Sequence, residues 1–216
     1  MSRVKAGRPS TSERRDTRSD LLKAAFELFS DQGFSKVNLN EIADRANVSI
    51  GLIRHYFGSK GGLVEECTGH VMERLSDVIG RILDGTGPSD GAGFIDHLRR
   101  KTYDNLIGNV GLLMYLRHLV IEYPAAANVA FIDYFQLLQQ EFNRLEAAGH
   151  LRSDVNKVWL TFHLMFLQMG PVFLSKQIEA IVGTPSHDPD TVRERNRANA
   201  TILMHGILSK PPGSTK

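Results

Sequence analysis

Apolar residues recur at steps of three and four along most of this chain, which is the spacing of one face of an α-helix. The first such run extends from Arg18 to about Gly33, where a glycine tolerates the left-handed backbone that often ends a helix. Thr17 is the candidate N-cap of this helix. No convincing alternation of a strand is present, so the pattern predicts an all-α fold of about nine helices.

Two short helices are predicted next, joined by a tight turn. Asn38 can cap the first one, because Glu41, three positions later, can reach back in a capping-box arrangement. Asn47 stands where the turn needs a left-handed backbone, which Asn tolerates best among the residues with a side chain. Ser49 can then cap a second short helix over residues 50–57.

A longer helix over residues 60–83 follows, with Ser59 as its candidate cap, and a Gly-rich stretch over 84–93 is interpreted as a linker. Two prolines interrupt the remaining helical pattern. Pro124 should end the helix before it, whereas Pro171 predicts either a kink within one helix or two helices that meet there. The remaining predicted helices cover residues 94–108, 110–123, 127–148, 154–181 and 189–208.

Charge divides the chain into a basic front and a nearly neutral body. The first 60 residues carry 11 Lys and Arg against 7 Asp and Glu, and the remainder carries 15 against 17. Such a front fits a phosphate-facing head, although a solvated basic tail is the alternative. The predicted organisation is a flexible basic arm (1–16), a three-helix DNA-binding domain (17–59), a connecting helix (60–83), the linker (84–93) and an effector-binding and dimerisation domain (94–216).

Composition narrows the class of protein. With 42% hydrophobic and 23% charged residues, the chain of 216 residues is expected to fold rather than to remain disordered. Its single cysteine, Cys67, excludes an intramolecular disulfide. No segment has the composition of a signal peptide or of a membrane span, so we expect a cytoplasmic protein without a membrane partner.

The second short helix carries the chemistry that points to DNA. A helix that reads DNA is packed at a steep angle on a supporting helix across a short turn, which is the layout predicted for residues 38–57. Ile53 and Phe57 are expected to point to the core, and the rest of the helix is left to face a major groove. Gly51 would allow close approach of the backbone. The candidates for direct contact with bases are Ile50, Leu52, Arg54 and His55.

These residues resemble the TetR family of bacterial transcription regulators, and the resemblance covers roughly Arg18 to Leu63. It rests on Leu-Leu-Lys-Ala-Ala-Phe-Glu-Leu-Phe (21–29), Asn-Glu-Ile-Ala (40–43), Ala-Asn-Val-Ser (46–49) and Ile-Arg-His-Tyr-Phe-Gly-Ser-Lys (53–60). The stretch over 48–57 is particularly similar to the choline-responsive repressors of this family. A shared reading helix does not imply a shared effector.

The resemblance implies a homodimer that places two reading helices in successive major grooves of a pseudo-palindromic operator in double-stranded DNA, with repression as the default. It also implies that Tyr56 and Lys60 grip phosphates, and that Asn38 and Ser49 cap helices and contact the DNA backbone. Arg18 is expected to flank a phosphate. The Gly61-Gly62 pair departs from the acidic residues common at this point of the family, which predicts a looser hinge between head and body.

Dimerisation is expected to use the last two long helices, as the resemblance implies. The same leucines would also serve as the core of a single subunit, so the alternative is an ordinary monomer core. The predicted interface residues are Leu160, Leu164, Leu167, Ile202, Leu203 and Ile207.

A small, hydrophobic or aromatic effector is expected to bind the C-terminal domain, where adaptable and aromatic side chains gather. For any one of them, a plain core position is the alternative. Arg117 and His118 are polar groups in an apolar helix, which could meet an effector carboxylate or could merely pair with a neighbouring acid such as Glu122. The candidates are Tyr103, Met114, Arg117, His118, Phe131, Tyr134, Phe135, Phe162, Phe166 and Met169.

Two other classes of protein are weighed against this interpretation. An enzyme would be expected to show a metal or nucleophile motif, and none of the common ones is present, so we predict no catalytic residue, no metal and no cofactor. A nonspecific architectural DNA binder would need no large apolar body. The function predicted from the sequence is therefore a ligand-responsive, sequence-specific DNA-binding regulator, released when the effector favours a conformation that does not bind DNA.

Overall fold

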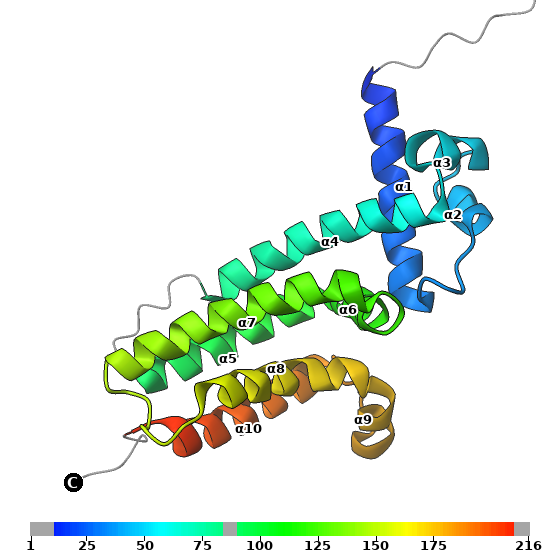
Figure 1. The fold of residues 1–216 in the computed structure, drawn as a ribbon. Coiled ribbons are helices and arrows are strands. Elements are labelled where there is room, and N and C mark those ends of the chain that lie inside the picture. The colour runs from blue at the N-terminus through cyan, green and yellow to red at the C-terminus, as the bar shows by residue number, and fades with distance from the viewer. Residues whose placement is uncertain (1–10, 84–89, 210–216) are drawn as a thin grey trace, which may run out of the picture. The chain divides into compact units, whose positions relative to one another are not determined.

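A computed structural model describes residues 11–83 and 90–209, and the N-terminal part of the expected arm and most of the expected linker lie outside these ranges. The described residues form ten helices and no strand, with a single isolated bridge between Leu151 and Leu208. The prediction of an all-α fold is confirmed (Figure 1).

In chain order, the helices are α1 (Thr11–Gln32), α2 (Leu39–Arg45), α3 (Ile50–Phe57), α4 (Lys60–Leu83), α5 (Gly91–Ile107), α6 (Val110–Glu122), α7 (Pro124–Ala147), α8 (Lys157–Phe173), α9 (Ser175–Val182) and α10 (Pro189–Ile207). The chain divides into two compact units, one up to Val71 and the other from Met72. Helix α4 begins in the first unit and ends in the second.

Two predicted boundaries are wrong. Helix α1 begins at Thr11, so Thr17 lies within the helix instead of capping it, and residues 11–16 are not an irregular arm. Glu and Arg in this stretch are good helix formers, so the helix can extend there without an apolar period. Helix α5 begins at Gly91, inside the expected linker, because the Asp90 side chain accepts a hydrogen bond from the Gly93 amide at 2.6 Å and caps the helix.

The prolines act at helix ends. Pro124 occupies the first position of α7, where its missing N–H costs nothing, and α6 ends two residues earlier. Helix α8 continues through Pro171 to Phe173, and the chain then bends by 76° at Leu174 into α9. The alternative of two separate helices is therefore the one observed, with the break one turn after the proline, and it accounts for the tenth helix.

The N-terminal unit is held by a small aromatic and aliphatic core. The Phe29 and Phe34 rings lie 5.0 Å apart, and the Cys67 thiol points to the Leu22 carbonyl at 4.0 Å. Fully buried positions on α1, α2, α3 and α4 contribute to this core, so all four helices are packed together. These positions are Leu21, Phe29, Ile42, Ile53 and Leu63.

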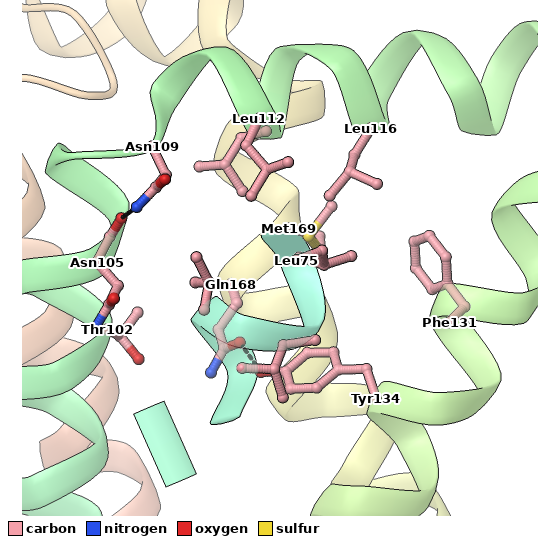
Figure 2. Close-up of a pocket in the computed structure, with 13 residues that line it drawn as sticks. Leu75, Thr102, Asn105, Asn109, Leu112, Leu116, Phe131, Tyr134, Gln168 and Met169 are labelled. Carbon is pink, nitrogen blue, oxygen red and sulfur yellow. Dashed lines mark hydrogen bonds between the residues drawn. The ribbon is translucent and has the colours of Figure 1, made fainter. Parts of the chain in front are cut away.

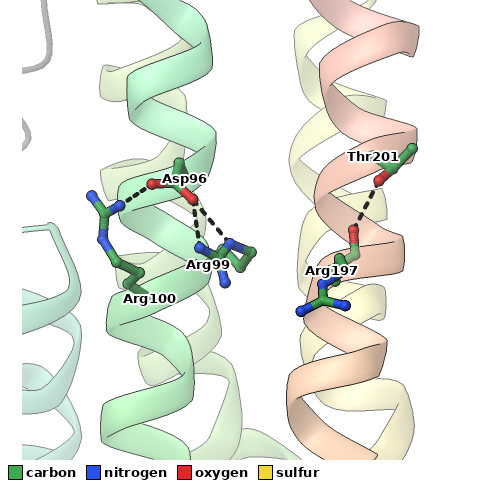
Figure 3. Close-up of polar contacts among 5 residues, drawn as sticks. All are labelled: Asp96, Arg99, Arg100, Arg197 and Thr201. Carbon is green, nitrogen blue, oxygen red and sulfur yellow. Dashed lines mark hydrogen bonds and ion pairs between the residues drawn. The ribbon is translucent and has the colours of Figure 1, made fainter.

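In the C-terminal unit, α5 lies along α10, and α7 packs on both α6 and α8. Figure 3 shows the polar side of the first pairing, where the Asp96 carboxylate on α5 binds Arg99 at 2.6 Å and also Arg100. The Thr201 hydroxyl on α10 donates to the Arg197 carbonyl at 3.1 Å. The ion pairs of Asp96 are thus made within α5 and not across to α10.

The turn between α3 and α4 uses two glycines, since Gly58 ends α3 with a φ of 71° and Gly62 allows close approach of the backbone. A Cβ atom on Gly62 would lie 2.2 Å from the Phe57 carbonyl oxygen, whereas one on Gly61 would lie 3.5 Å from the Ser59 hydroxyl, an ordinary contact. Gly62 is needed for close approach, and Gly61 is not. Close packing against the Phe57 carbonyl therefore explains why glycine stands at position 62, a reason separate from the predicted looser hinge.

We predict that Gly62→Ala lowers the free energy of unfolding by about 1–3 kcal/mol, because the clash is with backbone that has to shift. Gly61→Ala is the matched control and should raise stability by up to about 1 kcal/mol through helix propensity. Thermal unfolding followed by circular dichroism measures both. Equal effects of the two substitutions would contradict the role given to Gly62.

Candidate nucleic-acid interface and ligand cavity

The supporting helix α2 is fixed by a complete capping box. The Asn38 side chain accepts from the Glu41 amide at 3.1 Å, and the Glu41 carboxylate accepts from the Asn38 amide at 2.8 Å. Asn47 has a φ of 54°, which is the left-handed backbone predicted for the turn. The Val48 amide then donates to the Ala43 carbonyl at 2.9 Å and closes the turn. Four residues separate α2 from α3, as in a helix-turn-helix.

Helix α3 has one inner face and one outer face. Ile53 and Phe57, one turn apart, are 0% and 8% exposed, while Gly51, Arg54 and His55 are exposed. The other predicted base-contacting positions, Ile50 and Leu52, are half-buried, as is Tyr56. The His55 and Tyr56 rings meet edge to face at 5.3 Å. The helix therefore presents cationic and aromatic groups to solvent from a rigid support.

Only some of the residues that flank α3 have the roles predicted for them. Ser49 has the backbone of an N-cap but makes no capping hydrogen bond with its side chain. Ser59 does cap, since its hydroxyl accepts from the Gly62 amide at 3.2 Å, and half-buried Lys60 begins α4 beside it. Arg18 is engaged within the unit, because it pairs with Glu66 and lies over the Phe57 ring at 5.8 Å.

The C-terminal unit contains a cavity of about 730 Å³, part of it open to solvent. Figure 2 shows how side chains from α4, α5, α6, α7 and α8 surround it. Most of them are apolar. The lining residues are Leu75, Val78, Ile79, Thr102, Asn105, Asn109, Leu112, Leu113, Leu116, Phe131, Tyr134, Gln168 and Met169.

Several polar groups of the cavity satisfy one another. The Tyr134 hydroxyl donates to the Gln168 side-chain oxygen (Figure 2). Burial raises the pKa of Tyr134, and the hydrogen bond to Gln168 offsets only part of that effect, so the phenol is neutral at physiological pH. The Asn109 amide donates to the Asn105 carbonyl at 2.8 Å, and the Asn105 side-chain oxygen accepts from Arg81 at 3.5 Å.

Of the ten predicted effector residues, Phe131, Tyr134 and Met169 line this cavity. Two others contact different side chains: Tyr103 lies under Arg193 at 5.4 Å, and His118 lies 3.5 Å from Glu122, the alternative weighed for it. Met114 lines a separate cavity, and Arg117 is half-buried outside this one. Phe135, Phe162 and Phe166 belong to an aromatic cluster with Trp159, whose successive rings are 5.0–6.1 Å apart.

Sequence reasoning missed the polar part of the lining. Asn105 and Asn109 stand four apart on α5 and at the start of α6, and Gln168 interrupts the apolar sequence of α8. An amide in an apolar helix needs a partner when it is buried, so Gln168 was the detectable signal. The leucines and isoleucines of the lining carry no signal that separates them from core residues.

Most of the predicted dimer residues belong to the subunit's own core, which is the alternative weighed for them. Leu160, Leu164, Leu203 and Ile207 are at most 9% exposed, so they have little surface to offer a partner. Leu167 is half-buried. Helical period alone does not show which side of α8 and α10 packs within the subunit and which side stays exposed. The apolar residues that α8 and α10 do expose are Val158, Trp159, Phe166 and Ile202.

Two negative findings concern the described residues only. Within them, no three His, Cys, Asp or Glu side chains lie where they could hold a metal ion. No single described helix is both long and apolar enough to cross a membrane, and the one pair that passes by length and composition, α8 with α9, is bent by 76°.

Comparisons with known proteins agree with this geometry. The model of the family described as bacterial regulatory proteins, tetR family, matches residues 21–67. The HTH-type transcriptional regulator BetI 1 of Chromohalobacter salexigens is 39% identical over 64 residues, which cover 30% of this chain and 32% of that protein. BetI of Ectopseudomonas mendocina is 39% identical over 74 residues, which cover 33% and 38%. The matches thus span about a third of the curated relatives' length.

Solved structures match over the whole fold. The ketosteroid transcriptional regulator KstR2 of Mycobacterium tuberculosis superposes with a TM-score of 0.66 at 16% identity, covering 94% of this chain and 98% of its own. A putative transcriptional regulator from Saccharomonospora viridis in complex with choline gives 0.67 at 16% identity, covering 93% and 100%. The chain therefore shares the fold of these two structures. Residues 21–67 thus match the TetR family of bacterial regulatory proteins, and over the rest of the chain the likeness is one of fold.

The two faces of α3 predict opposite responses to truncation. Ile53→Ala should cost about 2–5 kcal/mol of unfolding free energy, because it leaves a cavity in the core. Arg54→Ala and His55→Ala should each change it by less than about 0.5 kcal/mol, because both side chains are exposed in the free protein. Urea unfolding measures this. A strongly destabilised Arg54→Ala protein would mean that the outer face has a structural role.

Proposed function

We propose that this protein is a ligand-responsive transcription regulator of the cytoplasm that binds a pseudo-palindromic operator as a homodimer and is released from it by a small molecule. The observation that carries the proposal is the outer face of α3, with exposed Arg54 and His55 above buried Ile53 and Phe57. A helix of eight residues held in this way fits a major groove.

In the proposed complex, Arg54 and His55 contact base edges, and Ile50, Gly51 and Leu52 bring the start of α3 against the groove. A guanidinium can bind guanine in a bidentate manner, and leucine can contact a thymine methyl group. Tyr56 and Lys60 bind phosphates, the latter with help from the positive end of α4. Because Arg18 is already paired with Glu66, we assign it to the support of α3 in place of the phosphate contact.

Homodimerisation is proposed through the exposed apolar side chains of α8 and α10. Trp159, Phe166 and Ile202 are each 58–65% exposed, and large apolar residues that gather on one surface are typical of an interface core. Two copies would bring two α3 helices to half-sites one helical turn apart. The palindromic operator follows from this symmetry.

Release is proposed to act through α4. This helix starts next to α3 at Lys60, and three of its later residues, Leu75, Val78 and Ile79, line the cavity. A ligand that packs against these residues would favour one position of α4 over another, and the spacing of the two reading heads would change. Repression relieved by ligand is the simplest outcome of this coupling.

Selection of bound fragments from random DNA tests the proposed operator. We predict a two-fold symmetric motif for the unaltered chain, and for Arg54→Ala a loss of about 1–3 kcal/mol at specific base pairs with relaxed preference there. Lys60→Ala should weaken all sequences alike and lower the salt slope by about 1. Arg152→Ala, which removes one exposed cation from the other unit, is the charge control. Recovery of no motif, with equal affinity for all DNA, would leave only nonspecific binding and refute the proposal.

Sedimentation analysis tests the proposed dimer. Phe166→Lys combined with Ile202→Lys should convert the protein to a monomer, because two unpaired charges would be buried in the interface. Ile181→Lys on α9 replaces a residue that is 84% exposed and should leave the dimer intact. A dimer that survives the double substitution would place the interface on another surface.

A further inference from the structure

We infer that the ligand of the C-terminal cavity is an uncharged, largely apolar carbonyl compound, such as a ketone, ester or lactone, and not a quaternary ammonium ion. This inference rests on the proposed effector site and adds the chemistry of its ligand. The lining residues, the unpartnered polar groups around them and the arrangement of the aromatic rings lead to the same class.

The charge of the lining speaks against a cation. None of the described residues that line the cavity carries a charge, and the guanidinium of Arg81 donates to one of them, Asn105, at 3.5 Å. An ammonium ion would lose its hydration there without a carboxylate to compensate. Positive charge close to the rim opposes it further.

The aromatic residues do not replace the missing carboxylate. Quaternary ammonium ions are bound in cages whose aromatic faces surround the cation. Here Phe131 and Tyr134 are the aromatic side chains of the lining, and they stand three residues apart on α7, so they form one wall (Figure 2). The aromatic cluster around Phe162 lies outside the lining.

Two unsatisfied polar groups near the cavity can each donate a hydrogen bond. Thr102 is 6% exposed, and its hydroxyl has no hydrogen-bond partner among the described residues. It lines the main cavity and also a smaller one of about 340 Å³, where the buried Asn196 side-chain nitrogen is likewise without a partner among the described residues. Gln168 lines both cavities and uses its oxygen for Tyr134. A ligand acceptor placed near Thr102 would satisfy what the protein leaves open.

A carboxylate is a weaker candidate for that acceptor. Arg99 lines the smaller cavity, but its guanidinium binds the Asp96 carboxylate through two nitrogens at 3.0 and 2.6 Å. The charge that a fatty acid would need is already compensated. A neutral carbonyl requires only donors, and an apolar remainder fits the aliphatic part of the main cavity.

Another buried threonine provides the comparison. Thr161 is 0% exposed, and its hydroxyl donates to the Lys157 carbonyl at 2.9 Å and accepts from Gln139 at 2.6 Å. The hydroxyl of Thr161 thus contributes to the fold, whereas that of Thr102 has no partner among the residues that the structure describes. Valine has the shape of threonine without the hydroxyl, so the same substitution separates the two roles.

The test uses three probes with similar chains: 2-undecanone, undecanoate and decyltrimethylammonium, each titrated calorimetrically into the full chain below its micelle concentration. We expect the ketone to bind at least about tenfold more tightly than either ion. Thr102→Val should weaken ketone binding about tenfold and raise the melting temperature of the free protein, because it removes an unpaired buried hydroxyl. Thr161→Val should lower the melting temperature and leave ketone affinity unchanged.

The inference is overturned if either ion binds as tightly as the ketone, if the ketone does not bind, or if Thr102→Val binds it as the unaltered chain does. DNA selection with the same protein is a separate readout and requires no ligand. Ketone binding without any operator motif would refute the proposed regulator and leave the chemistry of the cavity standing. A motif without ketone binding would do the reverse.

Discussion

The burial of Ile53 and Phe57 is the constraint on which the reading surface depends. Because these two side chains are one turn apart and fully packed, α3 cannot rotate about its axis without exposing one of them. Arg54 and His55 are therefore held on the opposite side. The capping box of α2 and the left-handed backbone of Asn47 fix where α3 starts. Gly62 allows the first turn of α4 to pack closely against the end of α3. A small number of backbone requirements thus prepares a rigid cationic surface.

The C-terminal unit differs from the N-terminal one, because it leaves a buried polar group without a hydrogen bond. Its cavity is mostly apolar, yet the hydroxyl of Thr102 is buried there without a partner among the residues that the structure describes. Native proteins rarely leave such a group unsatisfied unless a ligand or another function supplies the partner. Helix α4 contributes to both the reading unit and the cavity lining, which gives a physical route by which filling the cavity would influence DNA binding.

Much of the N-terminal unit could be predicted from the sequence, since capping and turn chemistry depend on residues close together in the chain. Asn38, Glu41, Asn47 and Ser59 do what their residue types favour. The start of α5 was missed because Asp90 was read as part of a Gly-rich linker and not as a cap. The cavity and the outer face of α8 were predicted poorly, because apolar period shows that a side chain is buried but not against which neighbour. Period also does not guarantee burial, since Leu164 is buried whereas Phe166, two positions away, is 60% exposed.

The central claim is that the outer face of α3 reads a major groove. Protection of guanine N7 from methylation by dimethyl sulfate tests it most directly on a selected operator, because N7 lies in that groove. We predict protected guanines in two grooves one helical turn apart, with the protection lost in Arg54→Ala while backbone contacts persist. Tight binding that leaves every N7 reactive would contradict the account.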